Sequence, residues 1–144
     1  MSNSDYADIV DQVLAQIGKH VVLGLPLGLG KPNRLINAFY HRACEDSSIR
    51  LDIFTALSLN PPKPGSELEQ RFLQPFVKRH FGEDYPRLAY ADALASQQLP
   101  ANITVTEFYF QSGSMLGNAD AQRHYVSSNY THVARDLADR GVNL

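Results

Sequence analysis

One stretch near the N-terminus constrains the fold more than any other. An apolar run of strand length covers residues 20–25, and residues 24–32 then contain three glycines and two prolines. Apolar side chains at positions 35, 36, 39 and 40 follow with the spacing of one helix face. The first turn of a helix has unpaired N–H groups and a positive dipole end, so this strand, turn and helix predict a ligand-binding turn.

The rest of the chain repeats this alternation of strand and helix patterns. Further strands are expected at 49–59 and 102–110, with a short extended segment at 125–128. Helices are expected at 5–17 with Ser4 as N-cap, 32–45, 66–82, 85–98 and 119–124, with a last one ending before Gly141. Pro75 predicts a kink or break near Gln74. The alternation favours an α/β three-layer sandwich with a mainly parallel sheet covered on both faces.

Ligands of such sheets bind at the carboxyl ends of the strands. Three loops have that position in this chain, at residues 24–31, 58–65 and 111–118. We expect the first and the third to form the site.

Composition narrows the class of protein. A length of 144 residues fits one domain, and a net charge of -2 argues against a dedicated nucleic-acid binder. The single cysteine, Cys44, favours a reducing compartment, and we interpret it as a structural thiol. Residues 1–5 lack signal-peptide character and no apolar run has membrane-spanning length, so we expect a cytoplasmic protein with no membrane contact.

Several of these segments resemble a known family. Residues 24–32 with 35–39 resemble the opening strand, glycine loop and helix of the coenzyme A transferase superfamily. More narrowly, they resemble the N-terminal domain of its acetyl-CoA hydrolase/transferase branch. A strand over 103–110 running into Gln111, Ser112 and Gly113, then residues 125–128 and a helix through Leu137, match the same template. The resemblance extends from about residue 17 to residue 141.

The resemblance implies two similar α/β halves packed face to face. It implies acyl transfer between CoA and a carboxylate through a glutamate in the second half, by way of a mixed anhydride and a glutamyl-CoA thioester. A carboxylate is a weak nucleophile, which such a site must keep dry, oriented and beside oxyanion donors. The CoA thioester would be the substrate, with no permanently bound cofactor. One wall of its pocket would be formed by Gly24, Gly28, Gly30, Lys31 and Pro32, with Ser112 and Gly113 nearby.

The family pattern continues beyond residue 144, so residues 1–144 are expected to be a truncated N-terminal domain. No catalytic glutamate can be assigned in it, and alone it is expected to be inactive. The expected partners are an acyl-CoA or carboxylate substrate, a missing C-terminal half or partner subunit, and a second copy in a homo-oligomer.

Several other patterns in the sequence resemble functional sites. The glycine turn does not have the spacing of GxGxxG. It also does not match GxxxxGK[ST], because Lys31 is followed by Pro32. A nucleotide site is therefore the weaker interpretation. Glu107 could be a tuned acid or base, but we favour a solvated edge position or an arginine partner. Phe108, Tyr109 and Phe110 are interpreted as core. The five histidines have no metal-ligand spacing.

Two other functional classes stay open. A non-catalytic ligand-sensing module is one, although no basic DNA-binding helix pair accompanies it. A structural half that mediates assembly is the other, and it would expose a large apolar patch.

Overall fold

The structure is a computed structural model that describes residues 3–144; Met1 and Ser2, part of the stretch without signal-peptide character, lie outside the described residues. Three parallel strands, β1 (His20–Gly24), β2 (Arg50–Thr55) and β3 (Ile103–Glu107), form one sheet in the order β1-β2-β3. The register places Leu23 beside Ile53 and Ile53 beside Val105. The α/β class with a parallel sheet, expected from the strand–helix alternation, is confirmed.

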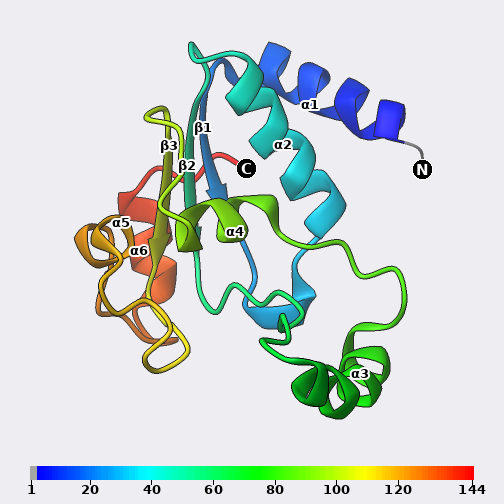
Figure 1. The fold of residues 1–144 in the computed structure, drawn as a ribbon. Coiled ribbons are helices and arrows are strands. Elements are labelled where there is room, and N and C mark those ends of the chain that lie inside the picture. Colours follow the sequence, from blue (N-terminus) through cyan, green and yellow to red (C-terminus); the bar gives the residue numbers. More distant parts are fainter. Residues whose placement is uncertain (1–2) are drawn as a thin grey trace.

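Helices cover both faces of this sheet (Figure 1). The helices are α1 (Asn3–Ile17), α2 (Asn33–Glu45), α3 (Glu67–Phe81), α4 (Ala89–Ala95), α5 (Ala119–Arg123) and α6 (Val133–Asp139), with a 3-10 turn at Gly28–Gly30. All of them except α3 pack against the sheet. Alternate residues of the strands, such as Leu51 and Ile53, pack with side chains of α1, α2, α4 and α5 in the main core. Phe54 and Phe108 point to the other face and pack against α6. The fold is therefore three layers.

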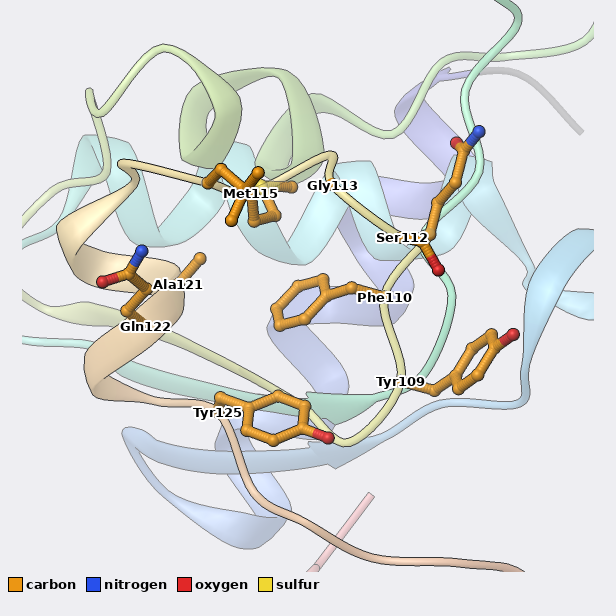
Figure 2. Close-up of a pocket in the computed structure, with 10 residues that line it drawn as sticks. Tyr109, Phe110, Ser112, Gly113, Met115, Ala121, Gln122 and Tyr125 are labelled. Carbon is orange, nitrogen blue, oxygen red and sulfur yellow. The ribbon is translucent and has the colours of Figure 1, made fainter.

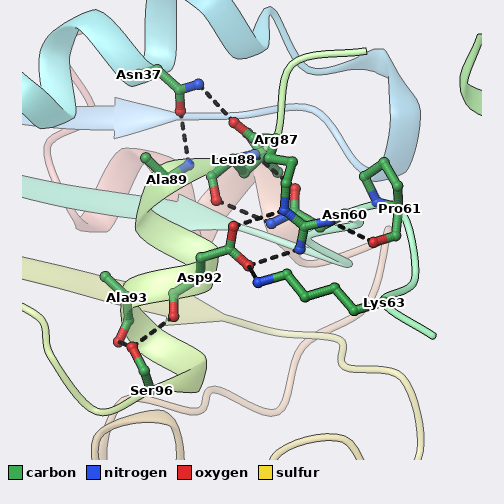
Figure 3. Close-up of polar contacts among 10 residues, drawn as sticks. All are labelled: Asn37, Asn60, Pro61, Lys63, Arg87, Leu88, Ala89, Asp92, Ala93 and Ser96. Atoms are coloured by element: carbon green, nitrogen blue, oxygen red, sulfur yellow. Dashed lines mark hydrogen bonds and ion pairs between the residues drawn. The ribbon is translucent and has the colours of Figure 1, made fainter. Parts of the chain in front are cut away.

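The helix expected at 85–98 begins later, at Ala89. Amide side chains hold the preceding segment in an extended form (Figure 3). Asn37 donates to the Arg87 carbonyl at 2.7 Å and accepts from Ala89 N at 2.9 Å. Asn60 makes the same pair of bonds with both backbone groups of Leu88. These distant amides replace the helical hydrogen bonds that local sequence favours.

The break expected near Gln74 is absent, because α3 runs continuously through Pro75. Both Arg71 and Pro75 are exposed, so the carbonyl that loses its donor at the proline lies at the solvent side. Ser4 lies inside α1, not at its cap. The strands at 49–59 and 102–110 are shorter than expected. Residues 125–128, expected as a short extended segment, belong to no helix or strand, and Val126 N donates to Glu107 O at 3.2 Å.

The outer edge of β1 is occupied by the last residues of the chain. Asn143 N donates to Val22 O at 3.1 Å, and Gly24 N donates to Leu144 O at 2.9 Å. The Asn143 side chain also accepts from Val22 N and donates to His20 O. Residues 143–144 thus extend the hydrogen bonding of the sheet beyond β1.

Two further sequence interpretations bear on the surface. Cys44 is exposed on α2, so it does not act as a buried structural thiol. Over residues 3–144, no helix combines the length and the apolar character that crossing a membrane requires.

Candidate functional site

The carboxyl ends of the three strands open into the loops where the sequence predicts a site. Lys31 ends the glycine turn after β1, and its side chain points inward with only 6% of the residue exposed. Its Nζ donates to Ala56 O at 2.8 Å and to Leu57 O at 3.3 Å, in the segment that follows β2. Leu57 has a φ of 49°, a left-handed conformation that is uncommon for a residue other than glycine. Lys31 therefore joins the first loop to a sharp turn in the second.

Glu107, the last residue of β3, is only 1% exposed, and within residues 3–144 no arginine pairs with it, which corrects the interpretation of a solvated or arginine-paired carboxylate. Its Oε1 accepts from Ser58 N at 3.0 Å and from Ser58 Oγ. The Ser58 oxygen then accepts from the Tyr90 hydroxyl, 2.7 Å away on α4. We call Lys31, Ser58, Glu107 and Tyr90 the edge cluster.

Burial sets the ionisation of the edge cluster. Removal from water lowers the pKa of Lys31 to about 8, and the charge of Glu107 opposes that shift. Removal from water likewise raises the pKa of Glu107, against the hydrogen bonds from Ser58 and the charge of Lys31. Burial also raises the pKa of the Tyr90 hydroxyl. The hydrogen bonds of Lys31 and Ser58 hold the loops after β1 and β2 together and attach the second loop to Glu107 at the end of β3.

Two glycines of the first turn are required for steric reasons. Gly28 has a φ of +61°, which side chains rarely adopt. A Cβ at Gly24 would lie 3.0 Å from Val142 and 3.2 Å from Leu137, so Gly24 permits the close approach of the C-terminal segment. The lack of a side chain at Gly24 is therefore explained by packing against Val142 and Leu137 of the same chain.

A cavity of about 410 Å³ lies at the end of β3, formed by the loop that follows the strand and by α5 (Figure 2). Phe110 and Tyr125 stack across it with ring centroids 5.8 Å apart. Ser112 and Gly113 lie in its wall together with Met115. The complete lining, which we call the β3-loop pocket, is Tyr109, Phe110, Gln111, Ser112, Gly113, Met115, Leu116, Ala121, Gln122 and Tyr125.

Local hydrogen bonds shape this loop. Ser114 N donates to Gln111 O at 3.0 Å, which closes a turn around Gly113. Asn118 caps α5 by accepting from Ala121 N, and its amide donates to Leu94 O of α4 at 2.6 Å. The pocket is therefore built on anchored backbone at both ends of the loop. Tyr109 is exposed at its mouth, contrary to the interpretation as core.

A second cavity, of about 440 Å³, lies on the α6 side of the sheet. One side of this cavity is formed by the glycine turn after β1, and the other by aromatic and aliphatic side chains of β2, of α6 and of the residue that follows β3. The lining is Gly24, Leu25, Pro26, Leu27, Phe54, Phe108, Tyr130, Val133, Leu137 and Val142. Both cavities lack charged side chains, so neither offers an ionic anchor by itself.

The site residues expected from the sequence do not come together in one pocket. Gly24 lines the α6-side cavity, whereas Ser112 and Gly113 line the β3-loop pocket. Gly28 and Lys31 are buried, and Gly30 and Pro32 are exposed beside them. Sequence reasoning missed Ser58 and Tyr90. It also missed the inward position of Glu107, although Glu107 shares its strand parity with the core residues Ile103 and Val105.

Within residues 3–144, no group of three histidine, cysteine or acidic side chains is placed to hold a metal ion. Comparisons of the chain with protein-family models, with curated proteins and with solved structures find no match.

Proposed function

We propose that this chain is the N-terminal part of an acyl-CoA hydrolase or CoA transferase and supplies walls of the acyl-CoA pocket. The observation that carries the proposal is the β3-loop pocket, an apolar cavity at the carboxyl end of a parallel strand, where ligands of such sheets bind. Its volume of about 410 Å³ falls in the range of small-molecule sites. The resemblance of residues 24–39 and 103–113 to the CoA transferase superfamily supports the same assignment.

The lining indicates which part of the substrate the β3-loop pocket would hold. It contains aromatic rings, a methionine and short polar side chains, but no charged group. The phosphates of CoA would therefore lie outside it, and the thioester with its acyl or pantetheine chain would lie inside. Gln111, Ser112 and Gln122 are among the lining side chains with donors that would orient a carbonyl there.

The edge cluster has a supporting role in this proposal. It fixes the turns after β1 and β2 through Lys31 and Ser58, and neither side chain lines the β3-loop pocket. The nucleophilic glutamate that the resemblance implies would come from a second half or a partner subunit. Alone, the chain is expected to bind acyl-CoA without turnover.

Thermal unfolding with added acetyl-CoA, butyryl-CoA, free CoA or ADP tests the proposal. Ligand that binds the native state raises the melting temperature with concentration. We expect acyl-CoA to stabilise the chain, and Ser112→Trp, which fills the pocket wall, to remove the effect. Ser114→Trp is the matched control, because Ser114 is an exposed neighbour outside the lining. Stabilisation by ADP alone, or an acyl-CoA effect that Ser112→Trp leaves intact, would contradict the proposal.

A further inference from the structure

Helix α3 stands apart from the sheet, joined to it by two loop segments (Figure 1). No residue within Glu67–Phe81 is buried. Its ends are nevertheless well defined, because Ser66 Oγ accepts from Glu69 N at 3.2 Å and Gly82 ends the helix with a φ of 76°. Local capping therefore maintains a helix that the core does not hold.

The two sides of α3 differ in their surroundings. Leu73 and Val77 are half-buried and share a small cavity with Pro62 and Pro64 of the preceding loop. Phe81 packs edge-to-face on Tyr85, with ring centroids 5.1 Å apart. This inner side accounts for only part of the apolar residues of the helix.

The outer side carries Leu68, Phe72 and Phe76, which we call the α3 stripe. Their spacing of four residues places them on one face, one turn above another. Leu68 is 78% exposed, Phe72 is 81% exposed and Phe76 is 47% exposed, with the Phe76 ring stacked on His80 at a centroid distance of 4.2 Å. Such a contiguous exposed apolar patch on a charged helix is typical of an interaction surface.

Charge along α3 indicates what the stripe binds. The first turn is acidic, with Glu67 and Glu69, and the last turn is basic, with Lys78, Arg79 and His80. Two such helices packed antiparallel bring the acidic turn of each beside the basic turn of the other, whereas parallel packing brings like charges together. A membrane-surface helix instead has a basic polar face, which Glu67 and Glu69 would oppose at an anionic bilayer.

We propose that the α3 stripe is a self-association surface, which packs antiparallel against the α3 stripe of a second copy of this chain. A two-fold interface must be complementary to itself, and the acidic first turn and basic last turn of α3 meet that condition in charge. With the axis near Phe72, Leu68 of one copy lies opposite Phe76 of the other, and Phe72 meets its own counterpart.

The size of the stripe sets the expected strength. Stable interfaces bury about 800 Å² on each partner, and three side chains on one helix cover less than that. The dimer should therefore be weak, with a dissociation constant between about 1 μM and about 1 mM. It should form as the protein concentration rises from about 5 to about 500 μM.

Sedimentation equilibrium of the full chain over that range is the test, in a Cys44→Ser background because the exposed thiol could link copies by a disulfide. We expect the mean mass to rise from 16.0 kDa towards twice that value. Phe72→Glu should leave the chain monomeric, with an unchanged circular dichroism spectrum. Leu116→Glu is the matched control, since Leu116 is 84% exposed but remote from the stripe, and it should dimerise as the parent does.

A charge exchange sharpens the test. The double variant Glu67→Lys/Glu69→Lys places basic residues in both end turns of α3, and Lys78→Glu/Arg79→Glu places acidic residues in both end turns, with Arg71 unchanged between them. Each alone should lose the dimer, and a mixture of the two should regain it as a heterodimer. A monomer at every concentration, a Phe72→Glu variant that dimerises like the parent, or no recovery in the mixture would overturn the proposal. A monomer that binds phosphatidylserine vesicles through Phe72 would also overturn it, in favour of a membrane surface. The acyl-CoA thermal shift should be the same with and without Phe72→Glu, so the proposed function is tested separately.

Discussion

Charged side chains are usually exposed and large apolar side chains usually buried, and the edge cluster and helix α3 depart from this rule in opposite ways. At the strand ends, the ammonium of Lys31 and the carboxylate of Glu107 are buried, whereas α3 exposes Leu68 and Phe72. The buried charges have partners within the fold, supplied by loops and helices 25 to 49 residues away in sequence. In the α3 stripe, Leu68 and Phe72 are exposed, and the partner of Phe76 is His80 of the same helix, with ring centroids 4.2 Å apart. The difference indicates that the first region is fixed by internal contacts and the second is available for external ones.

The largest expected effect is at the edge cluster. Lys31→Met removes the donor for Ala56 O and Leu57 O and leaves Glu107 without its neighbouring cation. We expect a loss of about 4 kcal/mol in the free energy of unfolding, measured in urea at pH 7. Lys63→Met, at an exposed lysine, should change it by less than about 0.5 kcal/mol. An equal small change in both variants would mean that the edge cluster does not stabilise the fold.

A proline replacement tests whether α3 is energetically separate from the body. Pro75→Ala restores a backbone donor in the interior of an exposed helix, which favours the helix by about 3 kcal/mol. Hydrogen exchange of α3 peptides should slow accordingly, while the unfolding midpoint of the whole chain stays the same. A matching rise in the global midpoint would show that α3 and the sheet unfold together.

The pH dependence of stability isolates the burial of Lys31. Its pKa falls from 10.5 to about 8 on folding, so between pH 8 and 10 the unfolded chain binds more protons at this group than the native chain. Stability from this group therefore rises with pH, by about 1 kcal/mol per unit. The free-energy difference between the parent and Lys31→Met, measured in urea at steps of pH, should increase over that window. A constant difference would contradict the lowered pKa.

The smallest effect is expected at the α3 stripe. Phe72→Ala should alter the stability of the monomer by less than about 0.5 kcal/mol, because the ring is 81% exposed. Phe39→Ala, at a buried ring of α2, should cost about 4 kcal/mol by comparison. Urea unfolding at low protein concentration measures both. A large loss at Phe72 would mean that the ring packs on this chain itself.

Local sequence patterns predicted the elements that depend mainly on residues close together in the sequence. Continuous apolar residues gave β1, and the glycine turn with the periodic apolar face gave α2. Glu107 shows the limit, because strand parity alone could place it on the core face, but its stabilising partner Ser58 lies 49 residues away. The start of α4 was wrong for a similar reason, since Asn37 and Asn60 are 50 and 28 residues from the backbone that they hold.

The prediction of the site was limited in the same way, by contacts between residues far apart in the sequence. The three loops at 24–31, 58–65 and 111–118 follow the strands as expected, but sequence could not show that residues of the first and third loops would line two separate cavities. Nor could periodicity show which face of α3 would be covered, because apolar residues occur on both its inner and outer sides.

The hydrogen bonds of residues 143–144 along β1 have a consequence for aggregation. An open sheet edge presents unpaired backbone groups to other molecules and can start intermolecular β-pairing. Here the Asn143 side chain engages Val22 N and His20 O, and its backbone N–H engages Val22 O. The C-terminal segment thereby shields the edge of β1, and detaching it would expose an apolar strand to pairing with other chains.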